Sequence, residues 1–152
     1  MIIDRDNLCG SVIRGEGYGR VLGFPTANIQ LAQFEAESFA IPPGVYAGTA
    51  EILGGRIRYR AGIVIEPLPG AVLPKIGAHL LDFSGNLYGK ELNLSLKQYL
   101  RPFVKFASVE ELRNQIERDL ALIRELVSVE SKEGSPSKKR NSRKSRPRPR
   151  AQ

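Results

Sequence analysis

A glycine-dense segment near the start of the chain is the first place where residue types and spacing suggest chemistry. Residues 10–28 run GSVIRGEGYGRVLGFPTAN and contain five glycines. Because glycine has no Cβ, its backbone N–H groups can approach and surround an anion, as a phosphate-binding loop requires. Neither GxxxxGK[ST] nor GxGxxG is present, and a tight turn between two strands would have the same composition. Arg20, beside the glycines, is placed either to hold a phosphate or to face water.

Thr26 and Asn28 follow this loop and are two residues apart. In an extended segment such a pair projects to the same face. A hydroxyl and an amide oxygen are hard ligands of the kind that Mg²⁺ takes while it keeps positions for phosphates and water. Without further context, however, this is a common polar pair.

The composition excludes several other kinds of site. The 152 residues include one cysteine, Cys9, and one histidine, His79. An internal disulfide framework, a CxxC pair and a multi-histidine metal centre are therefore impossible within one chain. No apolar run reaches the length of a membrane span, and the first residues lack the order of a secretion signal. We expect one soluble domain in the reducing cytoplasm, a monomer without a membrane partner.

Positive charge is concentrated at the C-terminus. The formal net charge is +7, but residues 131–152 contain nine basic side chains and one acidic one, so the rest is close to neutral. This tail is rich in Ser, Pro and Arg and lacks apolar periodicity, which predicts disorder. We divide the chain into a folded domain, 1–130, and a disordered basic tail, 131–152. The tail is expected to have only weak, nonspecific contact with polyanions.

The segments that must position these residues alternate as short β-strands do. They are separated by turn residues and comprise 10–14, 24–31, 45–53, 56–65, 75–83 and 87–97. Pro25 suits the entrance of a strand rather than its interior. Gly54-Gly55 indicates a two-residue hairpin, and residues 84–86 indicate another hairpin between the last two strands. The pattern is typical of an antiparallel meander, and so of a small barrel or sandwich.

One helix is predicted after the strands. Ser108 and Glu111 have the spacing of a capping box. Apolar residues then recur at intervals of three and four, at Leu112, Ile116, Leu120, Ile123 and Val127. Such a stripe ordinarily packs a helix against the body of a domain and by itself implies no ligand.

Taken together, these stretches resemble the riboflavin kinase family, which makes FMN from riboflavin and ATP. Separate motifs carry the resemblance in the same order: the glycine loop with LGFPTANI at 22–29, PGVYA at 43–47, HLLDFSGNLYGK at 79–90 and YLRPFVKF at 99–106. Gln115 and Asp119 match the family's C-terminal helix. The resemblance covers about residues 8–127. It implies an all-β fold with a C-terminal helix, a six-stranded antiparallel Greek-key barrel.

The resemblance also implies roles for individual residues. The nucleotide, ATP, would contact Gly15, Gly19, Arg20, Phe24 and Pro25. Mg²⁺ and the phosphates would be held by Thr26 and Asn28. Riboflavin or FMN would lie against the helix and the segment before it, at Arg101, Phe106 and Leu112. ADP would be the second product.

One position departs from the family pattern. Family members have a glutamate two residues before the histidine, as the base that activates the ribityl hydroxyl, and Gly77 stands there in this chain. The interval from Pro67 to Gly77 equals the family's, which argues against a misalignment. Val64 and Leu68 also replace family residues, so the strands expected to form the catalytic wall are those that differ most.

Other groups are candidates to replace the missing glutamate. His79 is two residues from Gly77 and shares its face of the strand, which makes it the best candidate proton acceptor, although a half-buried barrel histidine has the same pattern. Asp82 is five residues from Gly77 and should face the other side. Glu66 lies at the exit of the neighbouring strand. Loss of one base lowers a rate by roughly 10²–10⁴, so we expect slow turnover or none.

Three functions are compatible with these observations. The first is phosphorylation of riboflavin by ATP, supported by the glycine loop, by residues 25–28 and by the C-terminal motifs. The second is a module that binds flavin or nucleotide without turnover, supported by Gly77. The third is a nucleic-acid-associated barrel that acts through its tail. It is disfavoured, because the folded part lacks a basic stripe with interleaved aromatic residues.

Overall fold

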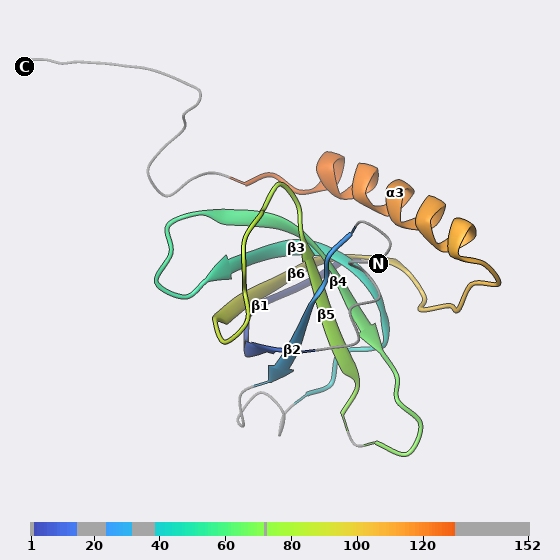
Figure 1. The fold of residues 1–152 in the computed structure, drawn as a ribbon, viewed down its shortest axis with the longest axis horizontal. Helices are drawn as coiled ribbons and strands as arrows, with labels where there is room; N and C mark the ends of the chain where they lie inside the picture. Colours follow the sequence, from blue (N-terminus) through green and yellow to red (C-terminus); the bar gives the residue numbers. More distant parts are fainter. Residues whose placement is uncertain (1, 15–23, 32–38, 72, 130–152) are drawn as a thin grey trace, which may run out of the picture.

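The computed structural model describes residues 2–14, 24–31, 39–71 and 73–129 (Figure 1). Within these residues, strands close into an antiparallel barrel in the order β1-β2-β5-β4-β3-β6. Their bounds are Ile2–Ile13 (β1), Ala27–Leu31 (β2), Gly44–Ile52 (β3), Arg58–Glu66 (β4), Lys75–Leu80 (β5) and Glu91–Arg101 (β6). Helix α3 (Val109–Leu126) follows β6 and lies across the outside of the barrel in Figure 1. The predicted fold class, a six-stranded antiparallel barrel with a C-terminal helix, is confirmed.

The strand order is that of a Greek key and not of a simple meander. Strands β3, β4 and β5 pair in succession, and β6 then returns to pair with β3 and with β1. The prediction that residues 84–86 join two paired strands is therefore wrong. Turn residues set a local bend, but the next partner depends on which strand edge is still open, and here the open edges are those of β3 and β1.

The connection between β3 and β4 also differs from its prediction. Residues 53–57 separate the two strands, so Gly54-Gly55 is not a two-residue hairpin turn. Gly54 has φ +85°, a conformation that favours glycine. The Gly55 N–H donates to the Ile52 carbonyl at 2.8 Å. The glycines do mark a chain reversal, but a longer loop surrounds them.

Side chains that point inward fill the barrel. Alternate residues of β4 and β5 are almost completely buried: Ala61, Ile63, Ile65, Ile76, Ala78 and Leu80. Tyr46 on β3 is fully buried, and its hydroxyl donates to the Pro42 carbonyl at 2.7 Å. Burial raises the pKa of Tyr46. The interior is a packed apolar core, which leaves the rim and the outer faces of the strands for a ligand.

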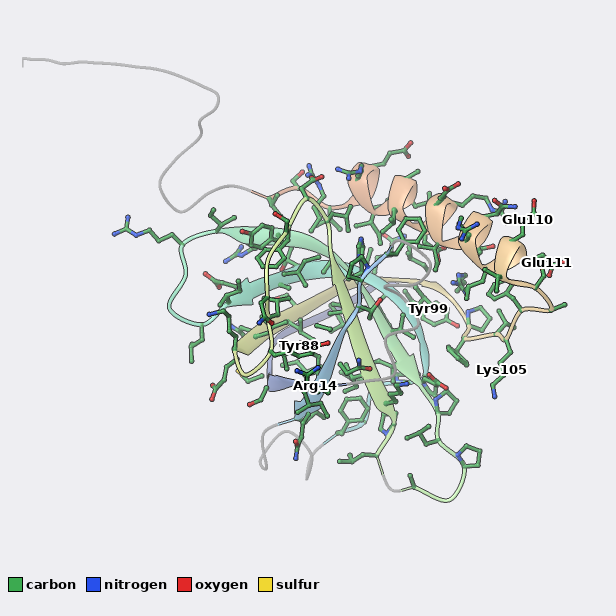
Figure 2. All side chains as sticks on the ribbon, viewed as in Figure 1. Arg14, Tyr88, Tyr99, Lys105, Glu110 and Glu111 are labelled. Atoms are coloured by element: carbon green, nitrogen blue, oxygen red, sulfur yellow. The ribbon has the colours of Figure 1, made fainter. Side chains whose placement is uncertain are left out.

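Helix α3 begins where the sequence predicts. Ser108 is the N-cap, and its Oγ accepts a hydrogen bond from the Glu111 N–H at 3.1 Å. Figure 2 shows Glu110 and Glu111 in the first turn of α3, where negative charge is favourable for the helix dipole. In the described part of the chain, no helix is both long and apolar enough to cross a membrane.

The C-terminal half of α3 packs against the outer face of the barrel. Ile123 and Val127 form a buried cluster with Ala47 and Leu81. Gly62 permits this close approach, because a Cβ at that position would lie 3.1 Å from Ile123 Cδ1. The Nε of Arg60 donates to the Val127 carbonyl at 2.7 Å and so fixes the end of the helix to β4.

Candidate active site

Two cavities in the described part of the chain meet at Thr26 and His79. The turn cavity, of about 570 Å³, lies between the ends of β1, β2 and β5 and the turn at 83–88. The helix cavity, of about 140 Å³, lies between the outer faces of β3 and β4, the end of β6 and α3. Thr26 and His79 line both cavities. A group bound in one cavity is therefore adjacent to a group bound in the other.

Strand pairing brings these distant residues together. In the β2–β5 register, Asn28 lies opposite Gly77 and Ala27 lies opposite Ala78. Residues two apart on a strand share a face, so His79 and Gly77 lie on the same face, as their spacing predicts. Asn28 lies on this face too. The ladder thus sets Thr26 and Asn28, at the start of β2, beside Gly77 and His79 of β5.

His79 is tied to the segment before β2. Its Nδ1 lies 2.6 Å from the Pro25 carbonyl oxygen. Because a carbonyl oxygen can only accept, Nδ1 carries the hydrogen, and in the neutral ring Nε2 then holds the lone pair. The Phe24 ring packs edge-on against the imidazole, with 6.0 Å between the ring centroids. These contacts hold the ring in the tautomer whose Nε2 can accept a proton.

Thr26 occupies the space beside Gly77. Gly77 is buried, and a Cβ added there would lie 2.9 Å from Thr26 Cγ2, closer than such atoms approach. The Thr26 hydroxyl donates to the Phe24 carbonyl at 3.1 Å. Since the obstacle is a methyl group and not backbone, a larger side chain at position 77 requires Thr26 to shift or to change its χ1 rotamer.

Two carboxylates considered as replacements for the glutamate lie outside both cavities. β5 ends at Leu80, so the prediction that Asp82 faces the opposite side of this strand does not apply. Asp82 is exposed and pairs with Arg124 of α3, with two oxygen–nitrogen distances of 3.0 Å. The Arg124 hydrogen bond lowers the pKa of Asp82. Glu66 ends β4 opposite Lys75 and, like Asp82, does not line either cavity.

Thr26 and Asn28 offer only uncharged oxygen donors. Among the described residues there is no group of three or more His, Cys, Asp or Glu side chains that could hold a metal ion. Mg²⁺ typically keeps several waters and binds together with substrate phosphates rather than in an all-protein cage. The two residues therefore fit a magnesium ion that arrives with a nucleotide better than a permanently bound metal.

The helix cavity is lined mainly by apolar and aromatic side chains. The structure brings together Arg101, Phe106 and Leu112, the three residues predicted to contact a flavin, in this lining. The guanidinium carbon of Arg101 lies 5.6 Å from the Phe106 ring centroid. Leu112 belongs to the apolar stripe of α3, so in the first turns of the helix this stripe borders a cavity as well as packing against the barrel.

The predicted nucleotide contacts are only partly described by the structure. Gly15, Gly19 and Arg20 lie outside the described residues. Pro25 lines the turn cavity, whereas Phe24 lines the helix cavity. The prediction placed these two neighbours at one ligand, but their side chains border different cavities.

Two pairs of residues at the cavities are not indicated by the sequence. Asp119 binds Arg101 inside the helix cavity, with Oδ2 2.8 Å from Nη2. At the turn cavity the guanidinium of Arg14 lies over the ring of Tyr88, 4.6 Å from its centroid, and Figure 2 shows the two side by side. Asp119 and Tyr88 both belong to recognised motifs, but spacing alone does not indicate their partners.

Comparison with known proteins matches most of the chain to one family. The model of the flavokinase family, described as riboflavin kinase, matches residues 5–127. The bifunctional riboflavin kinase/FMN adenylyltransferase of Escherichia coli strain K12 is 34% identical over 125 residues, which are 80% of this chain and 38% of that protein. The chain therefore spans well under half the length of this curated relative.

Two solved structures are similar in fold. A protein from Streptococcus pneumoniae described as a macrolide-efflux protein superposes with a TM-score of 0.71 and 26% identity, over 79% of this chain and 38% of that one. Riboflavin kinase from Trypanosoma brucei superposes with a TM-score of 0.61 and 23% identity, over 82% of this chain and 78% of that one. At 23% identity the second likeness shows a shared fold.

Proposed function

The chain belongs to the riboflavin kinase family, and from that premise we propose that it transfers the γ-phosphoryl group of ATP to the ribityl hydroxyl of riboflavin. The products would be FMN and ADP. The observation that carries the proposal is that the turn cavity and the helix cavity meet at Thr26 and His79. A nucleotide in one cavity and a flavin in the other would bring the two reacting groups to these side chains.

We assign the nucleotide to the turn cavity. Its volume of about 570 Å³ falls within the roughly 300–1,000 Å³ of typical ligand cavities. Arg14 and Thr26 contribute polar groups to its lining, and the glycine loop, with Gly15, Gly19 and Arg20, would contact the phosphates. Mg²⁺ held by the phosphates, Thr26 and Asn28 would neutralise charge that develops on the transferred group.

We assign the flavin ring to the helix cavity. Its lining of Phe106, Leu112 and neighbouring apolar side chains suits a planar aromatic ring. The cavity volume, about 140 Å³, is below that of typical ligand cavities, so only part of the ring would be enclosed. The ribityl chain would then extend toward Thr26 and His79, where the two cavities meet.

We propose His79 as the proton acceptor for the ribityl hydroxyl. Phosphoryl transfer depends mainly on positioning and charge stabilisation, so one base contributes only part of the rate. With Gly77 in place of the glutamate that the family resemblance implies, His79 lines both cavities and its Nε2 can accept a proton. We expect turnover that is slow, by roughly 10²–10⁴, relative to a kinase with the glutamate.

A flavin- and nucleotide-binding module without turnover is the second candidate function. It is favoured by the position of Thr26, whose methyl group takes up the space beside Gly77 where a catalytic side chain would begin. In both candidates the folded unit would end near residue 130, act as a monomer in the cytoplasm, and carry a basic tail with weak contact to polyanions.

The decisive experiment is FMN formation from riboflavin and Mg-ATP at high enzyme concentration, followed by chromatography with fluorescence detection. FMN in proportion to enzyme, lost in Asn28→Ala and in Thr26→Ala, is expected for the kinase. Loss in His79→Gln as well would support His79 as the acceptor. No FMN, with riboflavin fluorescence still quenched on binding, would identify the binding module, and absence of both signals would overturn both candidates.

Gly77→Glu sharpens the assignment of the catalytic wall. The substitution should raise the rate of FMN formation, because it supplies a carboxylate base at position 77. This requires Thr26 to move aside and the neighbouring strands to keep their geometry. The control is Gly77→Gln, which has the same size without a base. Equal rates in the two variants would contradict the role given to position 77.

A further inference from the structure

Arg101 and Asp119 form a buried ion pair between the end of β6 and the middle of α3. Asp119 is 5% exposed, and its Oδ2 lies 2.8 Å from Arg101 Nη2. The Nε of Arg101 lies 3.2 Å from Oδ1 and 3.1 Å from Oδ2. Gln115, one turn earlier in α3, donates from Nε2 to Oδ1 at 2.9 Å. Both carboxylate oxygens are thus engaged within the protein.

The pairing with Asp119 engages one edge of the Arg101 guanidinium and leaves the N–H donors of another edge. A guanidinium has five N–H donors in a fixed plane. In Arg101, Nε and Nη2 face Asp119, and Nη1 contacts the Pro102 carbonyl at 3.4 Å. Among the contacts of the described residues, one N–H on Nη1 and one on Nη2 remain for a ligand. These two donors belong to a side chain that lines the helix cavity.

Charge compensation decides which ligand suits those donors. The carboxylate of Asp119 offsets the positive charge of Arg101 inside a cavity whose lining is otherwise mainly apolar. The pair therefore presents directed donors with little net charge. Such a site favours a neutral ring with acceptor atoms on its edge over an anion, because an anion would gain more from an uncompensated guanidinium.

We propose that Asp119 is a positioning residue, supported by Gln115, that aims Arg101 at the acceptor edge of a neutral planar ring in the helix cavity. The inference rests on the proposed function, in which that ring belongs to riboflavin. Asp119 acts through Arg101, and the Phe106 ring beside the guanidinium limits its other movements. Specificity for the ring thus depends on a side chain that does not itself bind it.

The test uses Asp119→Asn in the full chain. An asparagine keeps the size of Asp119 but directs an N–H₂ group at donors, so Arg101 loses its orientation. Riboflavin affinity, followed by quenching of riboflavin fluorescence, should fall by about tenfold or more, which corresponds to loss of a hydrogen bond to a charged group. Affinity for ADP in the turn cavity should stay within about twofold. The apparent KM for riboflavin should rise while that for ATP does not.

The chain offers a matched control in Asp82→Asn. It removes another Arg–Asp pair between α3 and the barrel, at similar distances but outside both cavities. Riboflavin affinity should be unchanged in this variant. In an Arg101→Met background, Asp119→Asn should have no further effect on riboflavin affinity, because the residue it positions is gone.

Two results would overturn the inference. One is unchanged riboflavin affinity in folded Asp119→Asn, and the other is an equal loss of riboflavin and ADP affinity, which indicates a merely structural role. If Asp119→Asn does not fold, Gln115→Ala replaces it and should weaken riboflavin binding severalfold, with no change contradicting the inference. Wild-type protein that binds ADP but not riboflavin would instead refute the proposed flavin site.

Discussion

The two halves of α3 continue one apolar stripe, but they meet the barrel in different ways. The C-terminal half is packed, with Ile123 fully buried and Val127 nearly so. The N-terminal half stands over the helix cavity, which Leu112 and Ile116 line and which extends along the stripe to Leu120 and Ile123. One stripe therefore fixes the helix to the barrel near its C-terminal end and borders the proposed flavin cavity along the rest of its length.

The two Arg–Asp pairs that join α3 to the barrel also differ. Arg101 and Asp119, beside the cavity, have side chains that are 18% and 8% exposed, whereas Arg124 and Asp82 are 50% and 62% exposed. An exposed pair contributes little to stability because water and salt screen it. A buried pair orients its members strongly, since leaving either one unpaired is costly. The two ion pairs have similar nitrogen–oxygen distances, but only the buried pair is expected to orient its side chains strongly.

The largest effect is expected from Ile123→Ala, which attacks the packed half. Ile123 is fully buried and also lines the helix cavity, so its truncation enlarges the space under the helix and should lower the free energy of unfolding by about 2–5 kcal/mol. Urea denaturation measures this change. Leu122→Ala is the control, since Leu122 is 45% exposed, and it should stay within about 0.5 kcal/mol of wild type. A loss of stability of similar size in both variants would contradict the role of Ile123 in fixing the helix to the barrel.

Leu112→Ala tests the other half of the stripe. Leu112 borders the helix cavity, so its truncation should weaken riboflavin binding by about tenfold and change stability by less than about 1 kcal/mol. Titration of riboflavin fluorescence gives the affinity. Leu126→Ala, an exposed leucine of the same helix, should leave that affinity unchanged. If Leu112→Ala destabilises the fold as strongly as Ile123→Ala, the two parts of the stripe do not differ in their contribution to stability.

Ser108→Ala removes the N-cap of the cavity half. Loss of the bond from the Glu111 N–H should lower stability by about 1 kcal/mol. Ser108→Thr keeps a hydroxyl and should stay close to wild type. Thermal unfolding monitored by circular dichroism compares the three proteins. Identical midpoints for Ser108→Ala and wild type would mean that packing alone fixes the start of α3.

The smallest effect on stability is expected when acid protonates Asp82 of the exposed Asp82–Arg124 pair. Arg124 lowers the pKa of Asp82 below its ordinary value of 3.8, so the carboxylate binds a proton less readily in the folded protein. The stabilisation is therefore present above the ordinary pKa and is lost as pH falls through the folded value. The difference in unfolding midpoint between wild type and Asp82→Asn should be small at pH 7 and should shrink as the pH falls below 3.8. A difference that grows as the pH falls below 3.8 would contradict this assignment.

Local signals in the sequence were sufficient for several elements. The N-cap at Ser108 depends on residues within one helical turn, and the entry of β2 after Pro25 depends on the restricted backbone of proline. The wrong hairpin at 84–86 shows the limit of such signals, because a turn does not select the partner strand. For the site, motif resemblance indicated Arg101, Phe106 and Leu112, which do line one cavity.

By itself the sequence determined the strands and helix in outline, the family, and the glycine at position 77, because alternation, capping and motif identity are written in neighbouring residues. Only the tertiary structure decided that Thr26 and His79 join two cavities, that Asp119 holds Arg101, and that Asp82 turns away to Arg124. These contacts arise from barrel closure and strand register, which sum many weak long-range interactions. No short window of sequence contains that information.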